Sequence, residues 1–280
     1  MSDPPAQRTI DIDAYLTRIG YSGSRAPALE TLRSLHAAHP MAIPFENLDP
    51  VLGRPVALDA ASLAGKLIGA RRGGYCYEQN GLFLRMLAAL GFRVAGLSAR
   101  VLRGHVEPDA PPRSHMLLKV DISGEAYLAD VGFGLLTLTA PIRLHESSEQ
   151  ETPHGPVRVR AVGGEFELDA HSDGQWQVLY RFSLEEQLLQ DYEAPNWYRA
   201  THPNSPFVRN LMVARPLPDG RLGLINNQFS IRRNDGTLLR RELRSGEEMA
   251  DLLECEFGIR LPPPRDAVVR ALARFVTVSP

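Results

Sequence analysis

The sequence predicts an α+β fold, and a change of hydrophobic periodicity near Gly91 is the main reason. Before that point, apolar residues recur every three or four positions, as on the buried face of a helix. After it, short runs with period-two alternation are separated by Gly, Asp, Ser and Pro, which is typical of antiparallel strands. The last third mixes short strands with helices. We therefore expect a helical part, then an antiparallel sheet or barrel, then a mixed α/β part.

The first part is expected to hold four helical segments. The first two end at Gly20 and at Pro40, because glycine and proline are common helix stops. The third begins after Asp59, which can act as an N-cap, and the fourth closes at Gly91. The proline-rich stretch IPFENLDPVLGRPV is expected to be a loop. In order, the helical segments are residues 11–20, 28–40, 59–70 and 76–91, and the loop is 43–56.

The second part is expected to contain only strands, and the third part to contain both strands and helices. Six short runs follow Phe92 and carry the alternating pattern. A helix followed by a loop comes next, and then two strand segments and two helices. The expected strands of the second part are 92–102, 115–122, 125–133, 157–162, 165–170 and 176–182; the later segments are 183–203, 222–233, 237–243, 245–258 and 264–276.

Composition excludes several classes of protein. The chain has 280 residues and a formal net charge of -2, whereas a general nucleic-acid binder should be clearly basic. No apolar run has the length of a membrane span. The start MSDPPAQRTIDID lacks the basic and apolar regions of a secretion signal. Two cysteines do not form a disulfide scaffold, so we expect free thiols, no membrane or nucleic-acid partner, and a location in the cytoplasm.

Cys76 stands in the stretch RRGGYCYEQN, between two glycines and a helical pattern. The glycines permit a tight or left-handed turn into the helix. Cys76 is therefore expected in the first helical turn, where backbone N–H groups and the helix dipole favour an anion such as a thiolate. Residue type alone favours a buried structural cysteine. A nucleophile also needs a base and a group that orients the base.

His115 and Asp130 lie in two strand segments that a turn at Ser123 and Gly124 can join as a hairpin. A two-residue turn at these positions pairs residues whose numbers add to 247, which makes Asp130 the diagonal neighbour of His115 on one face. A turn shifted by one residue gives 245 and sets the two residues directly opposite each other. Either register places them on the same face. The alternative is a surface histidine and an unrelated aspartate.

Four motifs in fixed order complete this pattern: IPFENL at 43–48, RRGGYCYEQN at 71–80, SH at 114–115 and DVGFG at 130–134. Together they closely resemble the arylamine N-acetyltransferase family. The resemblance continues through NWYRATHPNSPF at 196–207, and the chain length fits. It implies a helical bundle with the cysteine (1–91), an antiparallel β-barrel with His and Asp (92–200) and a C-terminal α/β lid (201–280), in a papain-like Cys-His-Asp arrangement.

The resemblance also implies a reaction and its residues. Cys76, His115 and Asp130 match the catalytic triad of the family, and Glu46 matches an acid that pairs with Arg72. The implied reaction is ping-pong acetyl transfer from acetyl-CoA to an arylamine, an arylhydrazine or a related amine, through an acetyl-cysteine intermediate. Acetyl-CoA is then a co-substrate, with no permanently bound cofactor and no metal ion.

The binding residues that the resemblance implies surround the triad. Ser114 and the glycine loop would lie beside CoA, since backbone N–H groups can face phosphate where no side chain obstructs them. Three phenylalanines match the aromatic pocket for the acceptor, although core packing is the commoner role of this residue. The expected CoA residues are Ser114, Gly132, Phe133 and Gly134, and the expected acceptor pocket is Phe45, Phe133 and Phe207.

Two further features have open interpretations. Residues 199–244 carry nine arginines and three acidic residues, a formal charge of +6, which is either a solvated face or a site for the CoA phosphates. Cys255 lies in an apolar helical pattern and is expected to be structural. We expect a monomer or a homodimer.

Two other functions share parts of this pattern. A Cys-His-Asp hydrolase has the same residue order, but PFENL and DVGFG favour the acetyltransferase. A non-catalytic binding module is the third possibility, and an intact triad argues against it.

Overall fold

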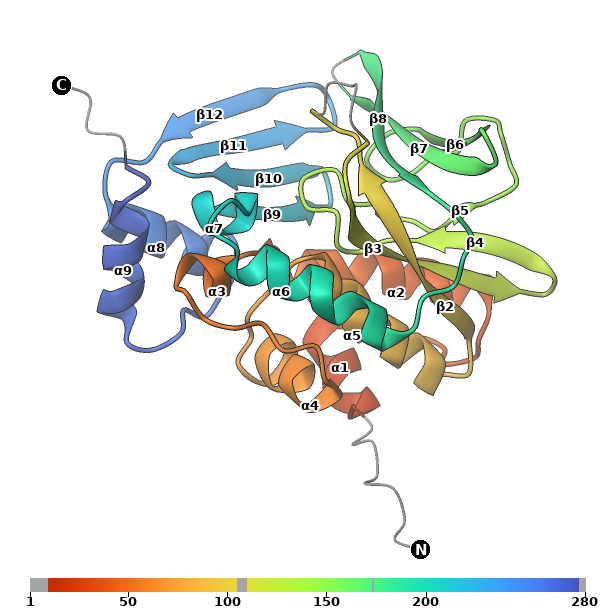
Figure 1. The fold of residues 1–280 in the computed structure, drawn as a ribbon, viewed down its shortest axis with the longest axis horizontal. Helices are drawn as coiled ribbons and strands as arrows, with labels where there is room; N and C mark the ends of the chain where they lie inside the picture. The colour runs from red at the N-terminus through yellow and green to blue at the C-terminus, as the bar shows by residue number, and fades with distance from the viewer. Residues whose placement is uncertain (1–9, 105–109, 173, 277–280) are drawn as a thin grey trace, which may run out of the picture.

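The computed structural model describes residues 10–104, 110–172 and 174–276, and the fold below refers to these residues. A layer of helices lies beneath two antiparallel sheets that stand side by side (Figure 1). In chain order the helical layer consists of α1 (Ile12–Ile19), α2 (Leu29–Ala42), α3 (Leu48–Val51), α4 (Ala60–Leu63), the π-helix η1 (Ala64–Gly69) and α5 (Cys76–Ala89). None of the described helices is long and apolar enough to cross a membrane.

The helix boundaries follow local capping chemistry, with two departures from expectation. Asp11 caps α1 and Gly20 ends it in the left-handed region, at φ 68°. The predicted end of α2 at Pro40 is wrong, because the helix continues to Ala42. Proline removes only its own N–H donor, and the next turn is still closed by the 2.8 Å bond from the Ile43 N–H to the His39 carbonyl.

The larger sheet is built from the segment in which strands were expected. Its seven strands have the spatial order β5-β4-β3-β2-β8-β7-β6, and every pair is antiparallel. The sheet curls around its own core of aliphatic and aromatic side chains, which includes Leu117, Leu168 and Tyr180. The strands are β2 (Arg93–Val101), β3 (Arg113–Ile122), β4 (Glu125–Ala129), β5 (Ile142–Arg143), β6 (Val157–Val162), β7 (Glu165–Ser172) and β8 (Gln175–Phe182).

The predicted barrel is therefore a curled half-barrel. Among the described residues β5 and β6 are the edge strands and do not pair with each other. In a closed barrel every strand is hydrogen-bonded to a strand on each side. The strand β5 has only two residues, which is too short to form such a second pairing with β6.

The second sheet has the order β1-β9-β10-β11-β12, and one of its strands comes from the other end of the chain. The expected loop at 43–56 instead holds β1 (Phe45–Glu46) and α3, and β1 pairs with β9 through Phe45–Ala214 and Glu46–Val213. The other strands are β9 (Met212–Leu217), β10 (Gly220–Ile225), β11 (Gln228–Arg233) and β12 (Leu238–Glu242).

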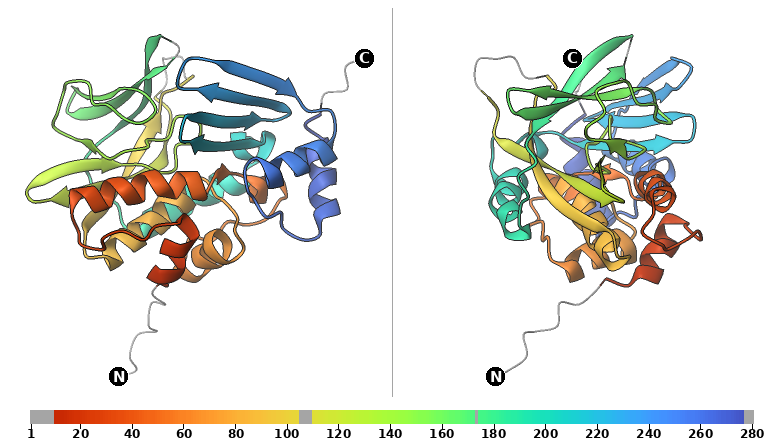
Figure 2. Two further views of the ribbon diagram at one scale, coloured as in Figure 1. Left: turned by 180° about the vertical axis from the view of Figure 1, so that it is seen from behind. Right: turned by 90° about the vertical axis from the view of Figure 1, so that its right-hand side faces the viewer.

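Helices close the molecule at one end and along one side. Near the C-terminus, α8 (Gly246–Cys255) and α9 (Arg265–Ala273) pack on the second sheet, where they share its core. The 3-10 helix η2 (Leu189–Tyr192) leads into α6 (Glu193–Thr201) and α7 (Pro206–Arg209), which run along the junction between the helical layer and the sheets (Figure 1). The view from behind shows α2 beneath both sheets (Figure 2), in contact with β9.

Three hydrophobic cores underlie these layers. The first joins α1, α2 and α5 to one face of β3 through Met116, Leu118 and Val120. The second lies between the β9–β12 sheet and α8 and α9, and the third lies inside the curled sheet. Because the first core crosses the expected boundary at residue 91, the cores do not test the three-part division, which stays a prediction.

Candidate active site

Cys76 is the first residue of α5, as the motif predicted. The helix start is fixed by Glu78, whose carboxylate accepts a hydrogen bond from the Tyr75 N–H at 3.1 Å. The Cys76 side chain is only 3% exposed, and its Sγ atom lies 4.0 Å from the Ser114 carbonyl oxygen on β3. The thiol therefore lies where the unpaired N–H groups of a helix start meet strand β3 of the curled sheet.

The two glycines before Cys76 serve close packing, which differs from the expectation. The left-handed residue of this turn is Arg71, at φ 52°, and neither Gly73 nor Gly74 has a positive φ. A Cβ atom on Gly73 would stand 2.0 Å from the Pro44 carbonyl oxygen, and one on Gly74 would stand 2.7 Å from Oε2 of Glu78. The glycines are needed because backbone and carboxylate approach them too closely for any side chain.

His115 and Asp130 lie on one face of the hairpin, as predicted, and form a hydrogen bond. The β3–β4 hairpin has the register that adds to 247, from Ile122–Glu125 to Leu118–Ala129, and the register adding to 245 is not adopted. Ser123 and Gly124 form the turn with φ values of 53° and 87°. His115 Nε2 lies 2.7 Å from Asp130 Oδ2, and both side chains are buried.

Asp130 accepts hydrogen bonds on both carboxylate oxygens. Oδ1 accepts from the Asn80 amide and the Gly132 N–H, each at 2.9 Å. Oδ2 accepts from His115 and, at 3.1 Å, from the Tyr180 hydroxyl. Burial acts to raise the pKa of Asp130, but the charge and hydrogen bond of His115 and the other donors outweigh it and lower the pKa.

The pKa of His115 moves in the opposite direction. Burial acts to lower it, but the carboxylate of Asp130 and the thiol of Cys76 outweigh burial and raise the pKa to about 10. At neutral pH the imidazole is therefore held as its cation. With Nε2 bonded to Asp130, Nδ1 is the ring nitrogen left for Cys76, so His115 lies between the thiol and the carboxylate.

The glycine loop that follows Asp130 is packed against the start of α5. A Cβ atom on Gly132 would stand 2.9 Å from both Cys76 Cα and Asn80 Nδ2, so only glycine fits there. Gly134 has a φ of 87°, which also favours glycine. These two glycines allow the loop to pack closely beside the thiol.

A cleft of about 1000 Å³ opens onto the thiol. The cleft lies between the curled sheet and the second sheet, with α6 and α7 at one side, and the expected CoA and acceptor residues all line it. Its size suits a small-molecule site. The predicted residues on its wall are Phe45, Cys76, Ser114, His115, Gly132, Phe133, Gly134 and Phe207.

Aromatic rings form one end of this cleft. The Phe207 ring lies 6.1 Å from that of Phe45 and 5.2 Å from that of Tyr75, measured between centroids. On the other side, Phe133 packs edge-on against His115 at 5.1 Å. Of the nine arginines at 199–244, Arg199 and Arg240 line the cleft, and Arg103 joins them. The described lining contains three arginines and no aspartate or glutamate.

Glu46 and Arg72 lie behind the cleft in a buried ionic network. Arg72 bonds Glu46 Oε1 through Nε at 2.9 Å and Nη2 at 2.8 Å, and it bonds Asp49 at 3.2 Å. Lys66 joins Asp49 and Glu78 at 2.5 and 2.6 Å. Glu78 in turn bonds the Tyr75 N–H, so the network links the PFEN segment to the helix that carries Cys76.

Several residues of the site were not predicted. Asn80 could have been found, because it lies in the quoted motif one helical turn after Cys76 and so shares its face. Tyr180 on β8 and His36 on α2, whose Nε2 accepts the Asp130 N–H at 3.0 Å, carried no sequence signal. The expectation for Cys255 is wrong: it is exposed at the end of α8, because it falls on the solvent side of that helix.

The chain matches a known family over most of its length. A family model described as N-acetyltransferase matches residues 28–266. The chain is 43% identical over 249 residues to the arylamine N-acetyltransferase of Escherichia coli K12, covering 89% of this chain and 88% of that protein. It is 44% identical over 257 residues to that of Mycolicibacterium smegmatis, covering 90% and 93%.

The chain belongs to the arylamine N-acetyltransferase family. This is a family of acyltransferases. Among solved structures, Mycobacterium marinum arylamine N-acetyltransferase in complex with CoA superposes with a TM-score of 0.92 at 39% identity, covering 95% of this chain and all of that one. The Mycobacterium tuberculosis enzyme gives 0.90 at 40% identity, covering 94% and 100%. The mixed α/β architecture is thus shared with arylamine N-acetyltransferase structures.

Proposed function

We propose that this protein transfers the acetyl group of acetyl-CoA to an arylamine, an arylhydrazine or a related amine through an acetylated Cys76. The observation that carries the proposal is the position of His115, which bonds Asp130 at 2.7 Å and lies beside a thiol that opens onto a cleft of about 1000 Å³. Membership of the family and the CoA complex of the M. marinum relative support the choice of donor.

The first half of the reaction forms the intermediate. The Cys76 sulfur, held as a thiolate by the His115 cation and the N–H groups of the helix start, attacks the thioester carbonyl carbon. A new C–S bond forms to Cys76, the C–S bond to CoA breaks, and the CoA sulfur leaves with the electron pair. His115 can give its Nδ1 proton to this leaving group, and Asp130 holds the resulting neutral imidazole through Nε2.

The second half transfers the acetyl group to the acceptor. The amine nitrogen attacks the acetyl-cysteine carbonyl carbon while His115 accepts a proton from that nitrogen. The bond to the Cys76 sulfur breaks, the amide product leaves, and the Cys76–His115 ion pair is restored. Asp130 stabilises the imidazolium without itself taking up the proton, because its pKa is held low.

The cleft supports binding sites for both substrates. We propose that Ser114, Gly132, Phe133 and Gly134 lie along CoA, and that Phe45, Phe133 and Phe207 hold the aromatic acceptor. The described lining of the cleft contains three arginines and no aspartate or glutamate, which suits a donor that carries phosphate groups. We further propose that Arg72 and Glu46 position the cysteine helix. A location in the cytoplasm stays a prediction.

Intact-protein mass spectrometry after brief exposure to acetyl-CoA without an amine tests the proposal. We expect the mass to rise by one acetyl group, peptide mapping to place it on Cys76, and the added mass to disappear when an arylamine is supplied. The Cys76→Ala protein should stay unmodified, and the Cys255→Ala protein should behave like the unaltered one. Acetylation at another residue, or hydrolysis of peptide substrates without acetyl transfer, would contradict the assignment.

A further inference from the structure

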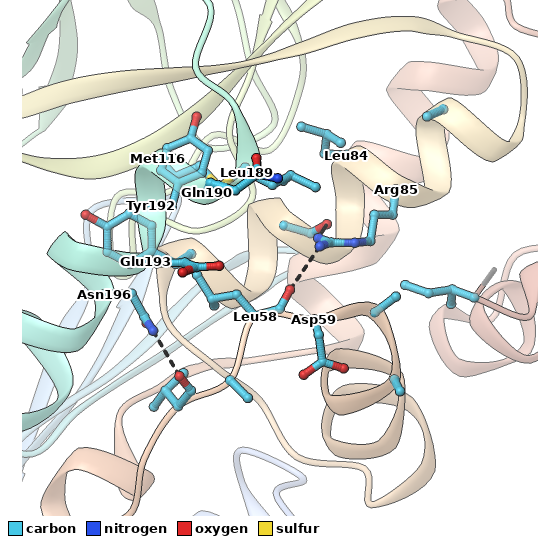
Figure 3. A pocket seen from close by; sticks show the side chains of 18 of the residues that line it. Leu58, Asp59, Leu84, Arg85, Met116, Leu189, Gln190, Tyr192, Glu193 and Asn196 are labelled. Atoms are coloured by element: carbon cyan, nitrogen blue, oxygen red, sulfur yellow. Dashed lines mark hydrogen bonds between the residues drawn. The ribbon is translucent and has the colours of Figure 1, made fainter. Parts of the chain in front are cut away.

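A second pocket of about 1010 Å³ lies on another face of α5 and is not used by the proposed reaction. We call it the α5 side pocket. One wall is a stripe of α5 side chains, the floor is the segment 56–61, and the opposite wall is η2 with the start of α6 (Figure 3). The α5 stripe consists of Tyr77, Gly81, Leu84, Arg85, Ala88 and Ala89.

The α5 side pocket is separated from the active-site cleft by the helix itself. Successive residues of a helix are about 100° apart around its axis. The stripe that lines the side pocket is therefore centred roughly 120° away from Cys76. Cys76 and Tyr77 follow each other in sequence but line different pockets. A ligand in the side pocket would not occupy the space in which the thiol reacts.

Hydrogen bonds hold the three walls in place without any ligand. Arg85 Nη2 donates to the Leu58 carbonyl at 3.0 Å, which ties α5 to the floor. Asn196 Nδ2 donates to the Val56 carbonyl at 2.9 Å, which ties α6 to the same floor (Figure 3). Tyr192 donates to the Leu97 carbonyl at 3.0 Å and so fixes η2 to the curled sheet. The pocket is thus formed in advance, as small-molecule sites usually are.

The polarity and charge of the lining residues indicate which kind of ligand the pocket can bind. Most of the lining is aliphatic: Val56, Leu58, Leu84 and Leu189 face the pocket from its different walls. The charged groups on it are Asp59, Arg85 and Glu193. Arg85 donates to the carbonyls of Gly81 and Leu58, and Asp59 accepts from the Ser62 N–H at the start of α4, so both side chains already have hydrogen-bond partners.

Glu193 is the remaining charge of the α5 side pocket. Its carboxylate makes no hydrogen bond or ion pair with any other described residue. Figure 3 shows Glu193 and Leu189 on the η2–α6 side of the pocket, Leu84 and Arg85 on the α5 side, and Leu58 below them. An aliphatic pocket with one unengaged carboxylate at its rim is complementary to an apolar body that carries a positive charge.

Two buried tyrosines, Tyr77 on α5 and Tyr192 on η2, are among the lining residues. The rings of Tyr77 and Tyr192 lie 5.8 Å apart, and the Tyr77 hydroxyl is buried without a hydrogen-bond partner in the described structure. An unpaired buried hydroxyl is uncommon, because it costs free energy that a partner would recover. We propose that the α5 side pocket is a second small-molecule site and that it binds apolar ammonium compounds.

The proposal is independent of acetyl transfer, and a quaternary ammonium probe can test it. Benzyltrimethylammonium has no N–H to acetylate, so it cannot act as an acceptor. We expect ligand-observed NMR titration to show saturable binding of one molecule per chain. The dissociation constant should be the same after carbamidomethylation of Cys76 and in the presence of CoA, because neither occupies this pocket.

Matched variants locate the site. Glu193→Gln should weaken binding of the cation about fivefold, the size expected for one exposed charge pair, and should leave the neutral probe 3-phenyl-1-propanol unaffected. Ala88→Trp should fill the pocket and abolish binding of both probes, while Glu151→Gln, an exposed acid on another element, should change nothing. Circular dichroism melting would show that each variant is folded. Competition with CoA, an unchanged affinity in Glu193→Gln, or no saturable binding to the unaltered protein would overturn the proposal.

Discussion

His115 Nε2 lies 2.7 Å from Asp130 Oδ2 across the β3–β4 hairpin, and this contact sets the charge of the whole site. The two residues are diagonal neighbours on one face, and Asp130 follows directly after the last paired residue of β4. The carboxylate keeps the imidazole protonated, because it raises the pKa of His115 to about 10 against the opposing effect of burial. The Cys76 thiol therefore faces a cation at neutral pH.

Replacing Asp130 with Asn should reduce activity far more than stability. The amide can still accept from Asn80 and Gly132 through its oxygen, but its NH₂ group would donate to His115 and favour the wrong tautomer. We expect kcat/KM for acetyl transfer to fall by about 10³- to 10⁴-fold, as when the aspartate of a triad is lost. Asp169→Asn is the control, because Asp169 is also a buried acid but pairs with Arg158 and Arg160 on another part of the curled sheet. It should cost stability and leave activity intact.

The two cysteines should differ completely in function. Cys76 is buried at the start of α5 beside His115, whereas Cys255 is exposed at the end of α8. Cys76→Ala should abolish acetyl transfer, and Cys255→Ala should retain most of it, as measured by release of CoA thiol. Similar losses in two folded variants would mean that the thiol beside His115 is not the nucleophile.

Alkylation of Cys76 should reveal a resting ion pair. Because the pKa of His115 is raised to about 10, the imidazole is cationic through the neutral range and favours the thiolate beside it. The unaltered protein should react with iodoacetamide at pH 6 faster than free cysteine does, and His115→Gln should remove this advantage. The rate should fall at lower pH as the coupled pair gains a proton. Identical rate–pH curves for the two proteins would show that no ion pair exists before the donor binds.

Stability should depend on pH through the buried histidines of α2. Burial is the main cause that lowers the pKa of His39 to about 3, from an ordinary value of 6.5. Below pH 6.5 the unfolded chain therefore binds a proton at this position that the folded chain does not, so the unfolding free energy falls as the pH falls. Each such group contributes a slope of up to about 1.4 kcal/mol per pH unit.

Glu78 acts in the opposite direction, because burial raises its pKa to about 7 and its protonation therefore makes the unfolding free energy rise as the pH falls. The contribution of His39 is therefore measured by comparing variants. Urea unfolding between pH 6.5 and 4.5 should give a shallower decline for His39→Gln than for the unaltered protein. The exposed His145→Gln is the control and should not change the slope. Parallel profiles for His39→Gln and the unaltered protein would contradict a neutral buried His39.

Replacing Glu46 should lower the free energy of unfolding by more than the loss of its own hydrogen bonds would. Glu46 accepts from Arg72 and from the Leu48 N–H at 2.6 Å, and both it and Arg72 are buried. Loss of one partner of a buried pair typically costs about 3–5 kcal/mol. Asp49 still contacts Arg72, so we expect Glu46→Ala to fall at the low end of that range in chemical unfolding. Glu30→Ala, which breaks only the exposed pair with Arg33, should change the unfolding free energy by less than about 1 kcal/mol.

The sequence predicted well the elements that depend on interactions between neighbouring residues. The stop at Gly20, the cap at Asp59, the helix that begins at Cys76 and the hairpin that sets His115 and Asp130 on one face each depend on a few neighbouring residues. The family motifs added Cys76, His115 and Asp130. The structure places Cys76 and His115 on the wall of one cleft, with Asp130 buried and bonded to His115. The α2 helix was predicted to stop too early, because a proline near a helix end removes one donor but does not exclude another turn.

Long-range packing decided what no segment of sequence displays. The PFEN stretch looks like a loop, yet Phe45 and Glu46 form a strand because their backbone groups find partners on β9, far along the chain. Tyr180 bonds Asp130 only because β8 lies beside β2 in the curled sheet, and Cys255 faces solvent because of how α8 meets the second sheet. The sequence by itself determined most of the helices and the β3–β4 hairpin, since hydrogen bonds and side-chain periodicity within a segment define them. The half-barrel, the shared strand β1, the cleft and the α5 side pocket were decided by tertiary structure, since each is formed by the packing of segments that are distant in sequence.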